Sequence, residues 1–203
     1  MQRVTNSIIE KGKGDNSMAN LFFYFDMDGV LADFKRGVKE ICGITPPVQD
    51  AVMSKEDDDA MWEKIRVTDH FYAKLPLMPG AKDLFSYVNS NYGSNCRILT
   101  AVPKPKRNIP EAGDDKIKWV HEQLSKDIEI NIVVKEEKKN FCEGKHCILI
   151  DDYKENIDDW EAMGGTGILH VDAEETLNMI KEIEEHIERY LDIELSKPAE
   201  QSV

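Results

Sequence analysis

Short, continuous apolar runs alternate along the chain with stretches whose apolar residues recur at helical spacing. The runs at 21–25, 96–100, 130–134 and 146–150 predict buried strands, and a weaker fifth run lies at 166–171. Helical spacing is found at 81–93, 114–126 and 154–165, and Gly93 is a suitable C-cap for the first of these helices. Strands that alternate with helices predict an α/β fold with a doubly wound, Rossmann-like parallel sheet.

Residues 35–76 interrupt this rhythm. They contain a proline pair, an acidic run at 56–59 and several aromatic residues. We expect a small, mostly helical cap that is inserted after the first strand and lies over the C-terminal ends of the strands. The core then comprises 21–34 and 77–195. We expect residues 1–20 to be disordered and 196–203 to form a flexible tail.

A further helix is predicted at 173–191, where apolar residues follow one face. It is expected to pack on the core, and it is compatible with a homodimer without requiring one. The aromatic residues Trp62, Phe71 and Tyr72 of the predicted cap are expected to serve mainly in core packing.

The composition limits the classes of partner and the compartments that are compatible with this chain. The net charge of -13 over 203 residues disfavours a long nucleic acid, whose phosphates the chain would repel. No apolar run approaches the ~18 residues of a membrane span, and the polar N-terminus lacks the apolar segment of a secretion signal. We therefore expect a cytoplasmic protein without a membrane partner. The cysteines form no CxxC pair and are expected to be free thiols, and the histidines have no zinc-site spacing.

Asp26 and Asp28 follow the first predicted strand directly. Two carboxylates at a strand end can divide a reaction between them, one acting as nucleophile and metal ligand, the other as general acid and base. The alternative is a simple turn, since Asp and Gly are common turn residues.

Asp151 and Asp152 close the strand at 146–150 and should reach the same sheet edge as Asp26. A bound Mg²⁺ would offset the repulsion within such a pair. One of them could instead be the N-cap of the helix that follows. Thr100 ends another strand and could bind a phosphate oxygen, and Lys138 or Lys139 could neutralise phosphate charge.

Together, the DxD motif, the threonine, the lysine and the DD motif resemble, in this order, the haloacid dehalogenase (HAD) superfamily of phosphohydrolases, over about residues 21–170. Within it the chain is similar to the 5'(3')-deoxyribonucleotidase group. The matching segments are DMDGVLADF, LPLMPGAKDL, ILTAV, DKIKWV and ILIDDYKENIDDW.

The resemblance implies a Mg²⁺-dependent phosphatase that hydrolyses nucleoside monophosphates, with a preference for deoxynucleotides, through an aspartyl-phosphate. It implies a role for nine residues: Asp26 as nucleophile and metal ligand, Asp28 as acid/base with its carbonyl on the metal, Asp151 and Asp152 as the remaining metal site, Thr100 and the Ala101 amide on the phosphate, Lys138 as the third-motif lysine, Lys116 on the substrate and Phe34 on the nucleobase.

Ala101 stands where the group often has Ser, and the segment before Asp151 aligns loosely, so that Lys139 stays an alternative to Lys138. Other functions also stay open. The protein could be a HAD phosphatase for a sugar phosphate or another metabolite, or a non-catalytic binding module. A polynucleotide 3'-phosphatase is disfavoured by the acidic charge.

Overall fold

The computed structural model describes residues 21–45 and 53–195. The expectations for 1–20 and 196–203 therefore fall outside the described residues. Five strands form one parallel sheet in the order β3-β2-β1-β4-β5. Their bounds are β1 Phe22–Phe25, β2 Cys96–Ala101, β3 Glu129–Val133, β4 Cys147–Asp151 and β5 Thr166–Leu169. Each of the five apolar runs contributes a strand, and the predicted α/β fold class is confirmed.

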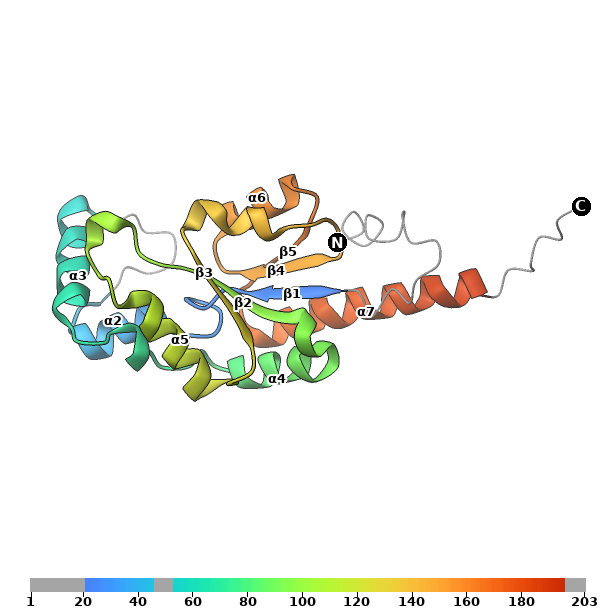
Figure 1. The fold of residues 1–203 in the computed structure, drawn as a ribbon, viewed down its shortest axis with the longest axis horizontal. Coiled ribbons are helices and arrows are strands. Elements are labelled where there is room, and N and C mark those ends of the chain that lie inside the picture. Colours follow the sequence, from blue (N-terminus) through green and yellow to red (C-terminus); the bar gives the residue numbers. More distant parts are fainter. Residues whose placement is uncertain (1–20, 46–52, 196–203) are drawn as a thin grey trace, which may run out of the picture.

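Helices cover both faces of this sheet (Figure 1). On one face lie α4 (Ala81–Tyr92), α5 (Ala112–Gln123) and α7 (Ala173–Leu195), and on the other lies α6 (Lys154–Ala162). The alternation of side chains along a strand explains the two cores. Phe23 and Phe25 of β1 belong to the large cluster that contains residues of α4, α5 and α7, whereas Tyr24 belongs to the smaller cluster with Trp160 of α6.

The order in which successive strands are added to the sheet reverses beside β1. From β1 the chain proceeds to β2 and then β3 on one side, and it returns to place β4 and β5 on the other side. The C-terminal ends of β1 and β4 therefore flank a topological switch point, the place where open α/β sheets bind their ligands. Short 3₁₀ helices occur in the connections: η2 Tyr72–Lys74, η3 Gly93–Asn95, η4 Pro105–Arg107 and η5 Lys135–Phe141.

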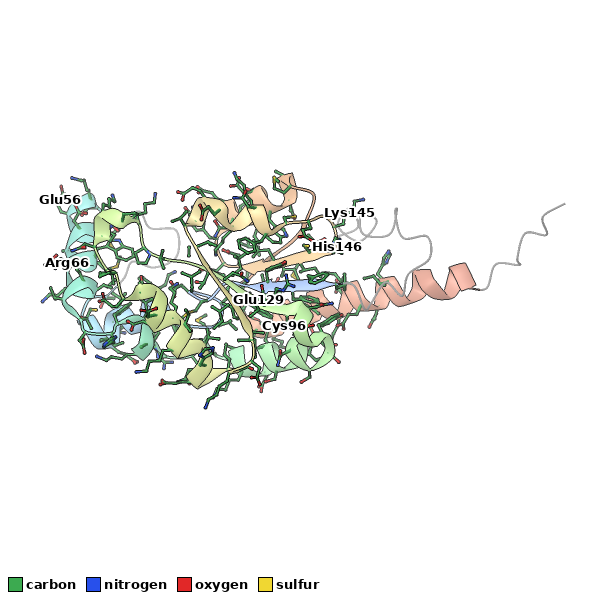
Figure 2. The ribbon with its side chains drawn as sticks, viewed as in Figure 1. Glu56, Arg66, Cys96, Glu129, Lys145 and His146 are labelled. Carbon is green, nitrogen blue, oxygen red and sulfur yellow. The ribbon has the colours of Figure 1, made fainter. Side chains whose placement is uncertain are left out.

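The described part of the predicted cap contains α2 (Phe34–Cys42) and α3 (Lys55–Val67). Both helices lie beyond the C-terminal ends of the strands (Figure 1). Figure 2 shows Glu56 and Arg66 of α3 at this end of the molecule, and Lys145 and His146, which precede β4, toward the other end. Buried residues of α3 such as Met61 and Ile65 share the large cluster with the sheet, so that the helix packs directly on the core.

The state of the cysteines and the packing of α7 agree with the predictions from the sequence. All four cysteines are free, with Cys96 and Cys147 buried and Cys42 and Cys142 half-buried. Ile180, Ile183 and Ile187 of α7 are buried against the core. Within residues 21–45 and 53–195, none of the helices combines the length and apolar character that crossing a bilayer requires.

Trp119 of α5 connects the core to the chain that returns from the cap. Its side chain is fully buried, and its Nε1 donates a 2.7 Å hydrogen bond to the Leu75 carbonyl oxygen. Trp119→Phe leaves this carbonyl unpaired, and we expect the free energy of unfolding to fall by about 1–3 kcal/mol in urea titrations. Lys118→Ala, at the exposed neighbouring position, is the control, with a change within about 0.5 kcal/mol. Equal stability of both variants would contradict this role.

Candidate active site

Asp26 and Asp151 lie side by side at the switch point. The Asp26 amide donates a 2.9 Å hydrogen bond to the Ile150 carbonyl, continuing the pairing of β1 with β4 beyond the last residue of β1. Both carboxylates are buried, and like charges this close repel each other. Lys138 separates them: its Nζ lies 2.8 Å from Asp26 Oδ1 and 2.7 Å from Asp151 Oδ2.

Lys138 reaches this position from η5, and its side chain is buried. Burial by itself lowers the pKa of an ammonium group, but the charges of Asp26 and Asp151 outweigh it, and the pKa of Lys138 is raised. Its neighbour Lys139 points elsewhere and pairs with the exposed carboxylate of Asp159 at 3.2 Å. Of the two candidate lysines, the structure places Lys138 at the carboxylates.

Asp151 is held by hydrogen bonds on both oxygens. Oδ1 accepts from the Tyr153 amide and from Asn156 Nδ2, at 2.9 and 3.0 Å. Oδ2 accepts from Lys138 and, at 2.9 Å, from the same Asn156 amide. Since a carboxylate has about four acceptor positions, Asp151 is saturated. It is suited to orienting Lys138, and it can approach a metal ion through water or by giving up one of these contacts.

Asp152, unlike Asp151, keeps its carboxylate oxygens free of hydrogen bonds from the described residues. Its side chain is exposed. Although it keeps contact with solvent, it is crowded by protein, and burial followed by repulsion from Asp26 and Asp151 raises its pKa to about 7. Gly29 allows the crowding: it has a φ of +82°, and a Cβ there would lie 2.1 Å from Asp152 Oδ2.

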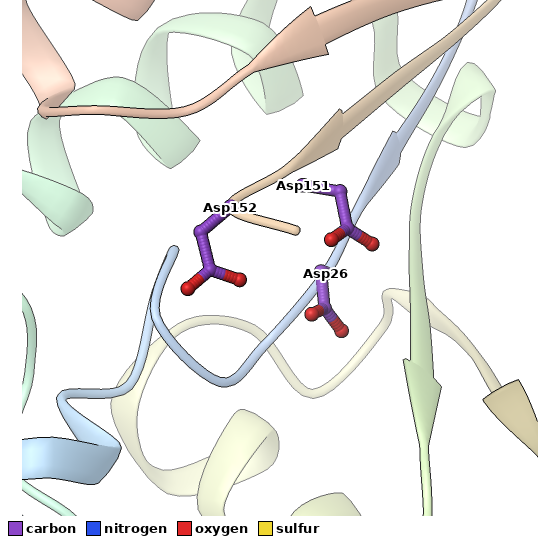
Figure 3. Close-up of side chains that lie close together, drawn as sticks. All are labelled: Asp26, Asp151 and Asp152. Carbon is purple, nitrogen blue, oxygen red and sulfur yellow. The ribbon is translucent and has the colours of Figure 1, made fainter. Parts of the chain in front are cut away.

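Figure 3 shows the carboxylates of Asp26, Asp151 and Asp152 converging from the ends of β1 and β4. One oxygen from each can be chosen so that all lie within 4.8 Å of one another. Such a set of hard oxygen donors suits Mg²⁺, which would also relieve the repulsion recorded in the pKa of Asp152. The second oxygen of Asp26 has no hydrogen-bond partner in the described part of the chain, so that it is available to a ligand.

Asp28 lies on the other side of Asp26 and contacts α5. Lys116 of α5 is buried, and its Nζ donates to Asp28 Oδ2 at 2.8 Å and to Thr100 Oγ1 at 2.9 Å. Asp28 Oδ1 is buried and has no hydrogen-bond partner among the residues that the structure describes. Burial raises the pKa of Asp28; the Lys116 charge opposes this shift and the Asp26 charge adds to it. A carboxyl group of this kind can hold a proton and donate it.

Aromatic side chains of the cap lie next to Lys116. The Tyr72 ring centroid is 5.0 Å from Lys116 Nζ and 6.2 Å from the centroid of Phe34, which in turn contacts Phe71 and Trp62. Phe71 and Tyr72 are buried, as expected of core residues, whereas Phe34 and Trp62 are half-buried. Of the four rings, only Phe34 and Trp62 therefore present appreciable surface to a ligand.

Eight of the nine residues named from the sequence lie in two neighbouring groups. One group contains Asp26, Lys138, Asp151 and Asp152, and the other contains Asp28, Lys116 and Thr100, with Phe34 linked to it through Tyr72. Ala101 ends β2 next to the buried Thr100, and its predicted amide contact stays a prediction. The N-cap alternative for the DD pair is wrong, because Tyr153 occupies that position at α6. The sequence did not predict a functional role for Asn156. Its position in the first turn of the helix that follows Asp152 is the sequence feature that could have indicated a contact with the DD motif.

No protein-family model and no curated protein matches the sequence. Solved structures with a similar fold include a hydrolase from Streptococcus pneumoniae TIGR4, which aligns over 78% of this chain and 97% of its own at 12% identity and a TM-score of 0.49. A HAD hydrolase of family IA, variant 3, from Entamoeba histolytica aligns over 83% and 99% at 19% identity and a TM-score of 0.44. A hydrolase from Pseudomonas syringae aligns over 82% and 90% at 18% identity and a TM-score of 0.42. At these values the likeness carries no conclusion about activity or substrate.

Lys138 and Lys139 form a matched pair of substitutions. Lys138→Met leaves the buried carboxylates without their cation, and we expect the free energy of unfolding of the metal-free protein to fall by about 3–5 kcal/mol. Lys139→Met removes one exposed ion pair and should cost at most about 1 kcal/mol. Urea titrations in EDTA measure both. A larger loss for Lys139→Met would contradict the placement of Lys138.

The raised pKa of Asp152 predicts how Mg²⁺ binding depends on pH. Below a pH of about 7 the metal-free group is protonated, so that binding must release its proton and is weakened; above that value the carboxylate is already charged. We therefore expect affinity to rise between about pH 6 and about pH 8. Calorimetry in buffers of different ionisation enthalpy measures both affinity and proton release. Asp152→Asn should remove most of the binding, and wild-type binding that does not change with pH would contradict the prediction.

Proposed function

We propose that the protein is a Mg²⁺-dependent phosphomonoesterase of the haloacid dehalogenase type, which hydrolyses nucleoside monophosphates through an aspartyl-phosphate. One observation carries the proposal. One oxygen of the Asp26 carboxylate pairs with the Lys138 ammonium, and this carboxylate lies beside those of Asp151 and Asp152, so that a nucleophile, a metal-binding set and a cation share one small volume. A dianionic phosphate needs all three to react with a carboxylate.

In the first step, the free Asp26 oxygen attacks phosphorus, and the bond from phosphorus to the leaving oxygen breaks. Asp28 gives its proton to that oxygen, for which its raised pKa is suited. In the second step, Asp28 takes a proton from water, and the water oxygen attacks phosphorus. The bond between Asp26 and phosphorus then breaks, which restores both carboxyl groups and releases inorganic phosphate.

Positive charge around the phosphoryl group is the main requirement of both steps. Lys138 supplies positive charge next to Asp26. Lys116 supplies it on the opposite side, where Asp28 and Thr100 accept its hydrogen bonds. Thr100 and the Ala101 amide would bind phosphoryl oxygens. Mg²⁺ held by Asp26, Asp152 and the Asp28 carbonyl, with Asp151 joining directly or through water, would polarise these oxygens and offset their charge.

One feature supports a nucleotide as the substrate, and a second supports a small ester over a polymer. Phe34 and Trp62, which retain exposed surface, belong to the aromatic cluster that contacts Lys116 through Tyr72, so that a leaving group protonated by Asp28 lies near rings. The net charge of -13 favours a small ester over a polynucleotide.

Phosphate release from ribo- and deoxyribonucleoside monophosphates and from several sugar phosphates, with Mg²⁺ and with EDTA, tests the proposal. We expect metal-dependent release that is fastest for deoxynucleotides. Release from sugar phosphates alone would keep the chemistry and overturn the nucleotide assignment. Absence of release from every ester would favour a non-catalytic binding module.

The covalent route has its own test. Asp26→Asn removes the nucleophile and should lower kcat by a factor of about 10⁴ or more, whereas Asp28→Asn should lower it by about 10²–10⁴ through loss of proton transfer. Asp114→Asn, at an exposed position of α5, is the control and should leave kcat unchanged. Near wild-type turnover by Asp26→Asn would exclude the aspartyl-phosphate.

A further inference from the structure

Arg107 joins the loop after β2 to helix α3 of the cap. It lies in η4, shortly after Thr100, and its Nη1 donates to Asp59 Oδ1 at 2.7 Å. Its Nη2 donates to Asp58 Oδ2, so that one guanidinium group spans two carboxylates of α3. Only 13% of the Arg107 side chain is exposed, which distinguishes it from an ordinary surface ion pair.

The same guanidinium group holds Trp62. The Arg107 Cζ lies 5.1 Å from the centroid of the Trp62 ring, an arrangement that allows a cation–π interaction. Trp62 Nε1 donates a 2.9 Å hydrogen bond to the other oxygen of Asp58. Arg107, Asp58 and Trp62 therefore form a closed set in which each group restrains the other two.

From Trp62 the contacts continue toward the catalytic groups. The Trp62 and Phe34 rings are 6.1 Å apart, and Phe34 contacts Tyr72, whose ring faces the Lys116 ammonium. Lys116 donates to Asp28, the proposed acid. Arg107, on the loop after β2, is thus connected through the half-buried rings of Trp62 and Phe34 to the place where the leaving group lies in the proposed reaction.

We propose that Arg107 is a positioning residue that fixes Trp62 and Phe34 and thereby determines how tightly the enzyme binds the ring-bearing part of its substrate. The inference rests on the proposed function for its substrate. Arg107 touches none of the proposed catalytic residues, so that its loss affects recognition of the base and leaves the phosphoryl chemistry intact. Lysine is a poor replacement, because its ammonium group lacks the planar fork with which the guanidinium group spans Asp58 and Asp59 while it lies over the Trp62 ring.

Steady-state kinetics of Arg107→Ala and Arg107→Lys provide the first test, with a deoxynucleoside monophosphate and with deoxyribose 5-phosphate, the same ester without its base. We expect KM for the nucleotide to rise about tenfold or more in both variants while kcat stays within about twofold. Values of kcat/KM for deoxyribose 5-phosphate should stay near those of the wild type. An equal loss on both substrates, or no loss on the nucleotide, would overturn the proposal.

Arg66→Ala is the matched control. Arg66 lies on α3, the helix that Arg107 contacts (Figure 2). It is exposed and pairs with Glu63 of the same helix. It should leave the kinetics on both substrates unchanged. A rise in nucleotide KM equal to that of Arg107→Ala would show that loss of any arginine in or next to α3 has the same effect, and would overturn the specific role of Arg107.

Fluorescence quenching by acrylamide tests the positioning without any substrate. The other two tryptophans, Trp119 and Trp160, are fully buried, so that quenching reports mainly on Trp62. We expect Arg107→Ala to increase quenching, and this increase to vanish in a Trp62→Phe background. Unchanged quenching would overturn the proposal even if the enzyme is a nucleotidase. Increased quenching in a protein that hydrolyses no nucleotide would instead contradict the proposed function.

Discussion

The ammonium group of Lys138 lies between the carboxylates of Asp26 and Asp151, and the arrangement of the whole site depends on this contact. Two buried carboxylates at adjacent strand ends repel each other unless a cation lies between them. Lys138 meets this need from η5, and Asn156 and the Tyr153 amide occupy the remaining acceptor positions of Asp151. Asp26 is left with one free oxygen and Asp152 with none of its acceptors used by described residues. The oxygens that we propose to react and to bind the metal ion are therefore those that have no hydrogen-bond partner among the described residues.

Asp26 divides the site into two sides. Toward β4 lie the carboxylates that can bind a cation, and toward β2 lie Asp28, Lys116 and Thr100. Raised pKa values occur on both sides, for Asp152 and for Asp28, with burial as the first cause in each. Their proposed uses differ because their partners differ. Asp152 faces other carboxylates, and a metal ion can take the place of its proton. Asp28 faces a lysine and the aromatic cluster, where a proton can pass to a leaving group.

The cap is bound to the core in two distinct ways. Apolar residues of α3 share one hydrophobic cluster with the sheet, which fixes the helix as a whole. Arg107 adds a directional contact from the loop that follows Thr100, and it restrains the half-buried ring of Trp62. Packing of the first kind tolerates small shifts, whereas a guanidinium group that spans two carboxylates does so much less. The second contact therefore suits the placement of rings that we propose to receive a flat ligand.

The sequence by itself determined the five strands, because buried parallel strands require continuous apolar runs, and it placed Asp26 and Asp151 at one sheet edge, because parallel strands end on the same side. Only the tertiary structure distinguished Lys138 from Lys139, or the saturated Asp151 from the open Asp152. Adjacent residues point in different directions, and which direction faces the site depends on how η5 and the turn at Gly29 pack. Likewise Lys116 meets Asp28, and Arg107 meets Asp58, over separations of 88 and 49 residues. Contacts of this range are set by the docking of helices on the sheet, which no local pattern encodes.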